Sequence, residues 1–292
     1  MKTVATKVEL RAALEPHRRE GARIGLVPTM GFFHPGHLSL MRKAREDCDL
    51  VVVSLFVNPT QFGPGEDLES YPRDEQRDAQ LAAAEGVDVL WAPSVDEMYP
   101  QGFASAVEVD AKLTAVLDGD PDSRGRSHFH GVTTVVAKLF NCVQPEVAYF
   151  GRKDAQQALV VQRMVRDLDF PIRIEVLPTV REDDGLAMSS RNTYLDREQR
   201  ERAAAISRAL GEAADAVAGG ERSTAALTAI VERELRAAGI EPEYVEARDA
   251  EDLSLVAELN GRPVLIAVAA AVGRARLIDN VVITQPGSEE EE

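Results

Sequence analysis

The feature that most constrains this chain is an alternation between two hydrophobic periods over its first two-thirds. Short runs rich in β-branched residues, typical of strands, are separated by stretches whose apolar residues recur at helical spacing. The strand-like runs are 24–29, 50–57, 87–92, 147–150 and 172–180, and helical patterns lie near 38–46, 73–85, 132–142 and 155–168. Near-continuously apolar strands that alternate with helices indicate a parallel sheet covered on both faces. We therefore predict an α/β fold, with a Rossmann-like doubly wound parallel sheet.

The pattern changes near residue 190, where we expect a domain boundary. Asp196 suits the N-cap of a long helix that reaches about Ala218 and ends at Gly219-Gly220. A second helix over about 224–238 and strand-like segments at 244–248, 264–271 and 277–283 follow. The sequence predicts three regions: a nucleotide-binding domain over 1–190, a smaller C-terminal α+β domain over 191–286 and an acidic tail over 287–292.

Charge and composition exclude several classes of protein. The 292 residues carry a formal net charge of −16, which argues against binding to nucleic acid or to an anionic membrane. No apolar run approaches the ~20 residues that span a bilayer, and the N-terminus does not resemble a signal peptide, so we expect a cytoplasmic protein. Cys48 and Cys142 lie far apart without CxxC spacing, which favours buried thiols over a disulfide or a zinc site.

Two histidines follow the first predicted strand, in the segment PTMGFFHPGH. Ligands of doubly wound sheets bind at the carboxyl ends of the strands. Gly31 and Gly36 let the backbone approach a ligand closely, and His37 opens a helix whose N-terminal amides favour an anion. The N–H groups of His34 and His37 can donate to phosphate oxygens as pyrophosphate leaves. A metal site is the competing interpretation, but no third ligand arrives at a suitable spacing.

Two further segments add positive charge and hydroxyls after later strands. Arg152 and Lys153 stand where a helix begins, with Asp154 suited to its N-cap and Gln157 one turn further on the same face. The segment 188–192, MSSRN, offers two hydroxyls and a guanidinium, which suit the clamping of a triphosphate.

Weaker signals come from uncharged and loop residues. Asn58 and Gln61 follow the second strand and can orient a small polyol acid by hydrogen bonds, although Asn-Pro is also an ordinary turn. The segment 123–131, with two histidines, suits either a mobile lid or a plain surface loop. The acidic pair 183–184 is read either as a contact to Mg²⁺ or as solvated turn residues.

These motifs together resemble a known family. HPGH followed far downstream by MSSR resembles the HxGH nucleotidylyltransferase superfamily, whose second motif is a relative of the KMSKS loop of class I synthetases. The segments SLFVNPTQF, YPR, HFHGV, YFGRKDAQQ, PTVRE and AMSSRN, in this order, resemble pantothenate synthetases, as do YVEARD and RLIDN near the C-terminus. The resemblance implies condensation of pantoate with β-alanine through a pantoyl-adenylate, giving pantothenate, AMP and pyrophosphate for coenzyme A biosynthesis. It also implies ATP as a substrate, Mg²⁺ and a homodimer.

The resemblance assigns roles to individual positions. His34, His37 and Lys153 would be catalytic, with His37 as proton donor. Gln61 would touch both pantoate and β-alanine, Asn58 would lie in the same pocket, and Gln157 would touch pantoate. The ATP-binding residues implied are Met30, Gly31, Phe32, Phe33, His34, Pro35, Gly36, His37, Gly151, Arg152, Lys153, Asp154, Val180, Met188, Ser189, Ser190 and Arg191. No metal ligands are assigned.

The chain departs from the family pattern at three places. Arg152 stands where the family commonly has Glu, Ala155 replaces a usual aromatic residue, and 123–128 lacks the common Arg-Pro-x-His spacing. These departures bear on rate and local geometry rather than on the class of reaction.

Three alternative functions differ in what they require. Nucleotidylyltransferases that act on phosphopantetheine or nicotinamide mononucleotide need a second phosphate site, against which the uncharged Asn58 and Gln61 argue. A synthetase acting on tRNA fits poorly with an acidic chain that lacks a basic anticodon-binding domain. A catalytically inactive nucleotide sensor would have lost one of four residues that are all present, namely His34, His37, Lys153 and Arg191.

Overall fold

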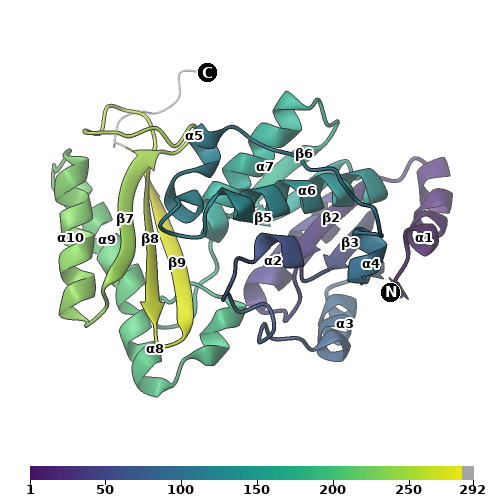
Figure 1. The fold of residues 1–292 in the computed structure, drawn as a ribbon, viewed down its shortest axis with the longest axis horizontal. Helices are drawn as coiled ribbons and strands as arrows, with labels where there is room; N and C mark the ends of the chain where they lie inside the picture. The colour runs from purple at the N-terminus through teal and green to yellow at the C-terminus, as the bar shows by residue number, and fades with distance from the viewer. Residues whose placement is uncertain (285–292) are drawn as a thin grey trace.

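A computed structural model describes residues 1–284 and shows two sheets with their covering helices (Figure 1). The larger sheet has six strands in the order β1-β4-β3-β2-β5-β6, and every neighbouring pair is parallel. Its strands are β1 Lys2–Val4, β2 Ile24–Thr29, β3 Leu50–Leu55, β4 Val89–Trp91, β5 Val147–Gly151 and β6 Arg173–Leu177. The predicted Rossmann-like parallel sheet is confirmed. The order reverses between β2 and β5, so the segments after these two strands lie side by side.

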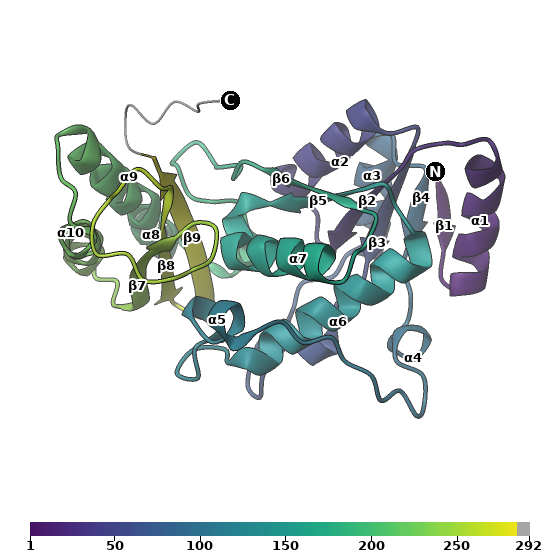
Figure 2. The ribbon, with the colours of Figure 1, turned by 90° about the horizontal axis from the view of Figure 1, so that it is seen from above.

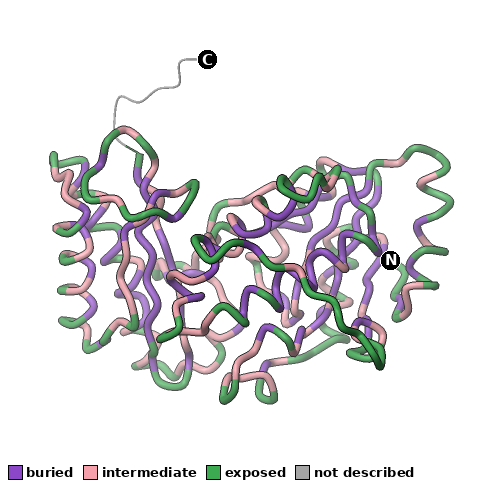
Figure 3. Tube along the Cα trace, turned by 45° about the horizontal axis from the view of Figure 1, so that its top comes forward, coloured by how far each residue is buried: buried purple, intermediate pink, exposed green. Residues whose placement is uncertain are grey.

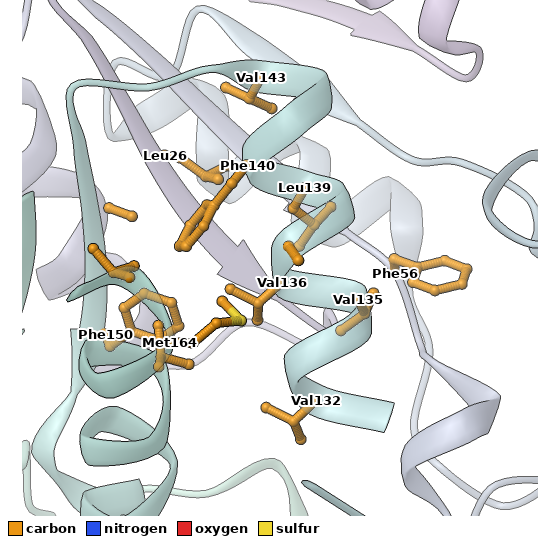
Figure 4. Close-up of a cluster of buried hydrophobic side chains, with 14 of the residues drawn as sticks. Leu26, Phe56, Val132, Val135, Val136, Leu139, Phe140, Val143, Phe150 and Met164 are labelled. Carbon is orange, nitrogen blue, oxygen red and sulfur yellow. The ribbon is translucent and has the colours of Figure 1, made fainter. Parts of the chain in front are cut away.

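Helices cover both faces of this sheet because the strands are apolar on both sides. One face packs on α2 Pro35–Asp47 and α3 Glu75–Ala84, and the other on α1 Lys7–Arg19, α6 Arg126–Val143 and α7 Ala155–Asp167 (Figure 2). Two short helices, α4 Val95–Met98 and α5 Ala111–Thr114, lie in the connection between β4 and α6. Figure 4 shows α6 beside α7 and against the sheet, where Val136 and Phe140 lie near Leu26, Phe150 and Met164.

The N-terminal strand and helix were not predicted from the hydrophobic pattern. β1 has only three residues, too few for periodicity to show. The start of α1 does have a sequence signal. The side chain of Thr6 accepts from the backbone N–H of Glu9, and the side chain of Glu9 accepts from the backbone N–H of Thr6. This reciprocal pair of hydrogen bonds is a capping box, and its sequence pattern is T-x-x-E.

The C-terminal part contains a three-stranded antiparallel sheet and three helices. The sheet has the order β7-β8-β9, formed by Pro242–Asp249, Val264–Val272 and Ala275–Ile283. Helices α9 Ala205–Ala218 and α10 Thr224–Ala237 cover one face, and β9 is the strand nearest the larger sheet (Figure 1). The predicted smaller α+β fold is confirmed, while its boundary near residue 190 stays a prediction.

The structure corrects two helix predictions. The single helix expected from 197 to 218 is wrong, because the chain turns at Ala204 and separates α8 Arg197–Ala203 from α9. The turn lets α8 lie beside β8 while α9 packs against α10. Helix α6 begins at Arg126, six residues before the start predicted at 132, so most of the supposed loop 123–131 is helical.

The burial pattern agrees with a chain built around these two sheets (Figure 3). Cys48 and Cys142 are free and buried, as predicted. Within residues 1–284, no helix is long and apolar enough to cross a membrane. The predicted acidic tail at 287–292 lies outside the described residues.

Candidate active site

A cavity of about 210 Å³ opens at the carboxyl ends of β2, β3 and β5. It brings together residues of the segments PTMGFFHPGH, SLFVNPTQF, YFGRKDAQQ and AMSSRN, although they are up to 163 positions apart in the chain. The predicted site residues that line it are Met30, His34, Gly36, His37, Asn58, Gln61, Gly151, Lys153, Asp154, Gln157, Val180, Met188, Ser189, Ser190 and Arg191. Those that do not are Gly31, Phe32, Phe33, Pro35 and Arg152.

The two histidines of HPGH lie next to each other at the start of α2, with their ring planes tilted by 37°. Their ring centroids are 4.0 Å apart, and the backbone N–H of His34 points at Nδ1 of His37 at 3.4 Å. This bond assigns the hydrogen of a neutral His37 ring to Nε2. Nδ1 of His34 is buried and has no partner among the described residues. The helix start therefore offers two imidazoles with unused polar atoms.

Both imidazoles are uncharged near neutral pH. Burial, reinforced by the positive charge of Lys153, lowers the pKa of His34 to about 4. Burial also lowers the pKa of His37 well below its usual value, with His34 and Lys153 adding to the effect. The rings thus act as neutral N–H donors in the ligand-free protein, and a bound polyphosphate would raise both pKa values.

A buried carboxylate that sequence analysis missed shapes the turn before the histidines. Asp78 of α3 is 1% exposed and accepts hydrogen bonds from the backbone N–H groups of Phe32 at 2.6 Å and Phe33 at 2.7 Å. Phe32 has φ +51° and Gly31 has φ +85°, so the turn needs such support. Gly31, Phe32 and Phe33 thus form the base of the site rather than its lining. Burial raises the pKa of Asp78.

Asn58 and Gln61 form one hydrogen-bonded unit. Nδ2 of Asn58 donates to Oε1 of Gln61 and to the carbonyl of Gly131, each at 3.1 Å, and its Oδ1 accepts from Tyr99 at 2.8 Å and from Thr60 at 2.9 Å. Asn58 is 1% exposed, and its polar atoms are all used within the protein. Asn58 therefore orients Gln61. The NH₂ group of Gln61 lies 3.1 Å from the sulfur of Met30, which also lines the cavity.

The adjacent glutamines of α7 differ in their use. Gln156 is buried, accepts from the N–H of Asp118 at 3.1 Å and donates to two carbonyls of the 113–116 segment. Gln157 lines the cavity. Gln156 is therefore used within the fold, whereas Gln157 lies in the cavity lining with Lys153 and Asp154, and its contact to a ligand stays a prediction. Asp154 is the N-cap residue of this helix, as predicted, but its side chain makes no capping hydrogen bond.

The segment 188–191 faces the HPGH turn across the cavity. Ser190 donates to the carbonyl of Phe32 at 3.3 Å, which ties this segment to the HPGH turn. Arg191 is bidentate to Asp67, with both N–O distances 2.8 Å, and lies 5.5 Å from the ring centre of Tyr71. Burial alone would raise the pKa of Asp67, but the hydrogen-bonded Arg191 lowers it. Asp67 does not line the cavity, so it holds the guanidinium from outside.

Part of the cavity wall is apolar. Helix α6 contributes four residues to it, and two more come from strand ends. Sequence analysis assigned none of these residues to the site: Val132, Val135, Val136 and Leu139 from α6, with Phe56 and Phe150 from strand ends. Helical spacing alone predicts such residues as core, because a core face and a cavity wall have the same pattern.

The remaining candidates are structural. His128 is buried in α6, where Nδ1 donates to the carbonyl of Gln61 at 2.7 Å and Nε2 accepts from Arg124 at 3.1 Å. A smaller cavity of about 80 Å³, which adjoins the first, is lined by both residues. Asp184 pairs with Arg200 at 3.1 Å, and neither member of the pair 183–184 lines either cavity, which supports the turn interpretation.

Comparison with known proteins identifies the family. The family model described as pantoate-beta-alanine ligase matches residues 2–282. The chain belongs to this family. The predicted resemblance to pantothenate synthetases, and with it the ligase class of enzyme, is confirmed.

Similar members of the pantoate-beta-alanine ligase family cover nearly the whole chain. A pantothenate synthetase of Moorella thermoacetica is 53% identical over 97% of this chain and 99% of its own. The structure of pantothenate synthetase from Thermus thermophilus has 48% identity and a TM-score of 0.90, and covers 96% of this chain and 99% of its own. A ligase from Francisella tularensis, complexed with beta-gamma ATP and beta-alanine, has 32% identity and a TM-score of 0.80 over 97% of each chain.

Proposed function

We propose that this chain condenses pantoate with β-alanine at the expense of ATP, giving pantothenate, AMP and pyrophosphate. The observation that carries the proposal is the division of the cavity into two chemically different parts. Neutral imidazoles, Lys153 and Arg191 suit a polyphosphate, while Gln61 and Gln157 share the lining with apolar side chains of α6. Pantoate carries a carboxylate, two hydroxyls and two methyl groups, which match the second part.

In the first step, the carboxylate of pantoate attacks the α-phosphorus of ATP, and pyrophosphate leaves. The step needs no protein nucleophile, so the chain supplies position and charge stabilisation. Lys153 provides the positive charge, and His34 and His37 donate to phosphate oxygens. The hydroxyls of the segment 188–191 and Arg191 complete the clamp, and the NH₂ group of Gln61 orients pantoate.

In the second step, the neutral amine of β-alanine attacks the acyl-adenylate and releases AMP. Because this mixed anhydride hydrolyses readily, water must be kept away between the two steps. The apolar wall of α6 excludes water on one side. We infer that the segment 188–191 closes over the other side when the triphosphate is bound.

We also propose that Mg²⁺ accompanies ATP. Among residues 1–284, no cluster of three or more His, Cys, Asp or Glu side chains forms a metal cage. That fits Mg²⁺, which binds through substrate phosphates with one or two carboxylates. Asp154 is the one described carboxylate in the cavity lining and would supply that ligand. When bound, the ion neutralises phosphate charge.

Two further proposals concern the assembly and the location of the protein. A homodimer would appear as a mass near 64 kDa, twice the 31.8 kDa of one chain, in light scattering after gel filtration. A cytoplasmic location fits a reaction that consumes ATP, and fractionation of cells that produce the protein would test it.

Product analysis by mass spectrometry tests the reaction directly. The protein is incubated with ATP, Mg²⁺, pantoate and β-alanine, and each is omitted in turn. Pantothenate and AMP should appear together, and only in the complete mixture. Folded protein that binds ATP but makes no pantothenate would refute the proposal and direct the search to phosphopantetheine as the next adenylyl acceptor.

A further inference from the structure

Strand β9 joins the second sheet to the site. It is an edge strand, and it lies beside both the turn Arg152–Asp154 and the turn Ser190–Tyr194. Figure 2 shows β9 on the side of its sheet that faces the larger domain. Consecutive side chains on a strand point to opposite faces. Two neighbouring residues of β9 can therefore reach two different segments.

Asn280 reaches the turn that carries Lys153. Its Nδ2 donates to the carbonyl of Arg152 at 3.0 Å and to the carbonyl of Lys153 at 2.9 Å. The side chain is buried, since Asn280 is 6% exposed. An amide NH₂ group has two hydrogens, so each carbonyl receives one. The backbone at Lys153 is thus fixed by a residue 127 positions away.

Asp279 reaches the segment that leads to the MSSR motif. Its carboxylate is bidentate to Arg181, with distances of 2.6 and 3.0 Å, and Asp279 is 4% exposed. Arg181 follows Val180 and also donates to the carbonyl of Gly185 at 3.1 Å. The hairpin that begins there returns to Met188, whose N–H donates to the carbonyl of Val180 at 3.0 Å. The ion pair therefore anchors the base of the 188–191 segment.

We propose that Asp279 and Asn280 form one positioning unit that sets the two ATP segments relative to each other. The proposal rests on the proposed function, which gives Lys153 and the segment 188–191 their contacts to ATP. The unit contacts the segments of the ATP half of the site directly. Gln61 is held by Asn58 and by the carbonyl contact of His128, which do not involve β9.

The test is the effect of Asn280→Ala on each substrate separately. The variant should raise the KM for ATP about tenfold, the scale of losing one or two neutral hydrogen bonds, and lower kcat. Its KM for pantoate should stay within about twofold of wild type. A residue that serves only stability would lower the melting temperature and the active fraction, and would leave the KM for ATP of the folded protein unchanged.

Asn260→Ala is the matched control. Asn260 is an exposed asparagine of the same domain, and its side chain accepts only from the N–H of Arg262. This variant should keep both KM values. Folded Asn280→Ala with wild-type kcat and KM for ATP would overturn the proposal. If Asn280→Ala does not fold, Asp279→Asn is tested in its place, and wild-type kcat and KM for ATP would again overturn the proposal. This substitution keeps the shape of the side chain and removes the charge that pairs with Arg181.

Failure of the proposed function would be distinguishable. If the wild-type protein makes no pantothenate, the reaction is wrong, and the positioning unit is then tested by calorimetry with β,γ-methylene-ATP. Asn280→Ala should bind this analogue about tenfold more weakly than wild type. Equal affinities would overturn the inference.

Discussion

The close approach of α6 to the turn Pro59–Gln61 makes Gly131 a sensitive position. A Cβ added at Gly131 would lie 2.3 Å from the carbonyl oxygen of Thr60 and 2.6 Å from the backbone nitrogen of Gln61. Both are backbone atoms, so no side-chain rotation relieves the contact. For Gly131→Ala, the turn must retreat by about 1 Å to restore an ordinary van der Waals distance.

Two opposing contributions determine how far Gly131→Ala changes the free energy of unfolding. Ala in a helix interior is about 0.5–1 kcal/mol more favourable than Gly. Overpacking costs about 1–3 kcal/mol, and loss of the bond from Asn58 to the carbonyl of Gly131 adds about 1 kcal/mol. The free energy of unfolding should therefore fall by about 1–3 kcal/mol. Because Gln61 moves with the turn, kcat/KM for pantoate should fall by about 10²-fold, the scale of a 1 Å misplacement.

Urea unfolding and steady-state kinetics with pantoate varied measure the two effects. The control is Gly211→Ala in α9, where an added Cβ meets nothing within 4 Å. That variant should gain about 0.5–1 kcal/mol and keep its kinetics. Gly131→Ala with wild-type stability and wild-type kcat/KM for pantoate would refute the reasoning.

Four more predictions concern the site. His37→Ala should lower kcat by roughly 10²–10³-fold in a folded variant, the effect of losing one transition-state donor; near-normal turnover contradicts that role. Gln157→Ala should raise the KM for pantoate more than the KM for ATP, whereas Gln156→Ala should mainly lower the melting temperature. An equal rise of both KM values in Gln157→Ala would argue against a pantoate contact. Asp78→Ala should lower the free energy of unfolding by about 2–4 kcal/mol in a urea titration, because two backbone N–H groups lose a charged acceptor; a loss under 1 kcal/mol contradicts this. Since the pKa of His34 is lowered to about 4, the unfolded chain binds more protons below pH 6.5, so stability should fall from there toward pH 4, and less steeply in His34→Gln; parallel profiles would exclude that contribution.

The fold and the centre of the site were predictable because both are written locally in the sequence. Apolar strands and helical spacing gave the parallel sheet, and the rule that ligands bind at strand ends placed HPGH, Lys153 and MSSR together. The start of α6 was misplaced because Gly131 reads as an interruption of a helix. In the structure this glycine lies inside the helix, where only a hydrogen fits against the neighbouring turn.

The residues that support the site were not predictable, because their roles depend on tertiary contacts. Asp78 looks like an ordinary acidic residue of a surface helix, yet it is buried under the HPGH turn. Asp67 lies in a loop and pairs with Arg191, 124 positions later. Asn280 belongs to the other sheet. Conversely, Arg152 was expected to bind phosphate, but its side chain is exposed outside the cavity. Its carbonyl accepts a hydrogen bond from Asn280.

The buried residues of helix α6 affect both the melting temperature and the shape of the substrate cavity. Val132, Val135, Val136 and Leu139 belong to the main hydrophobic core and also form the cavity wall. Repacking at these four positions to raise the melting temperature would also reshape the space offered to the substrate. An engineer who seeks a more durable enzyme should therefore leave α6 unchanged and work on α9 and α10, whose buried faces belong to the separate core of the second sheet.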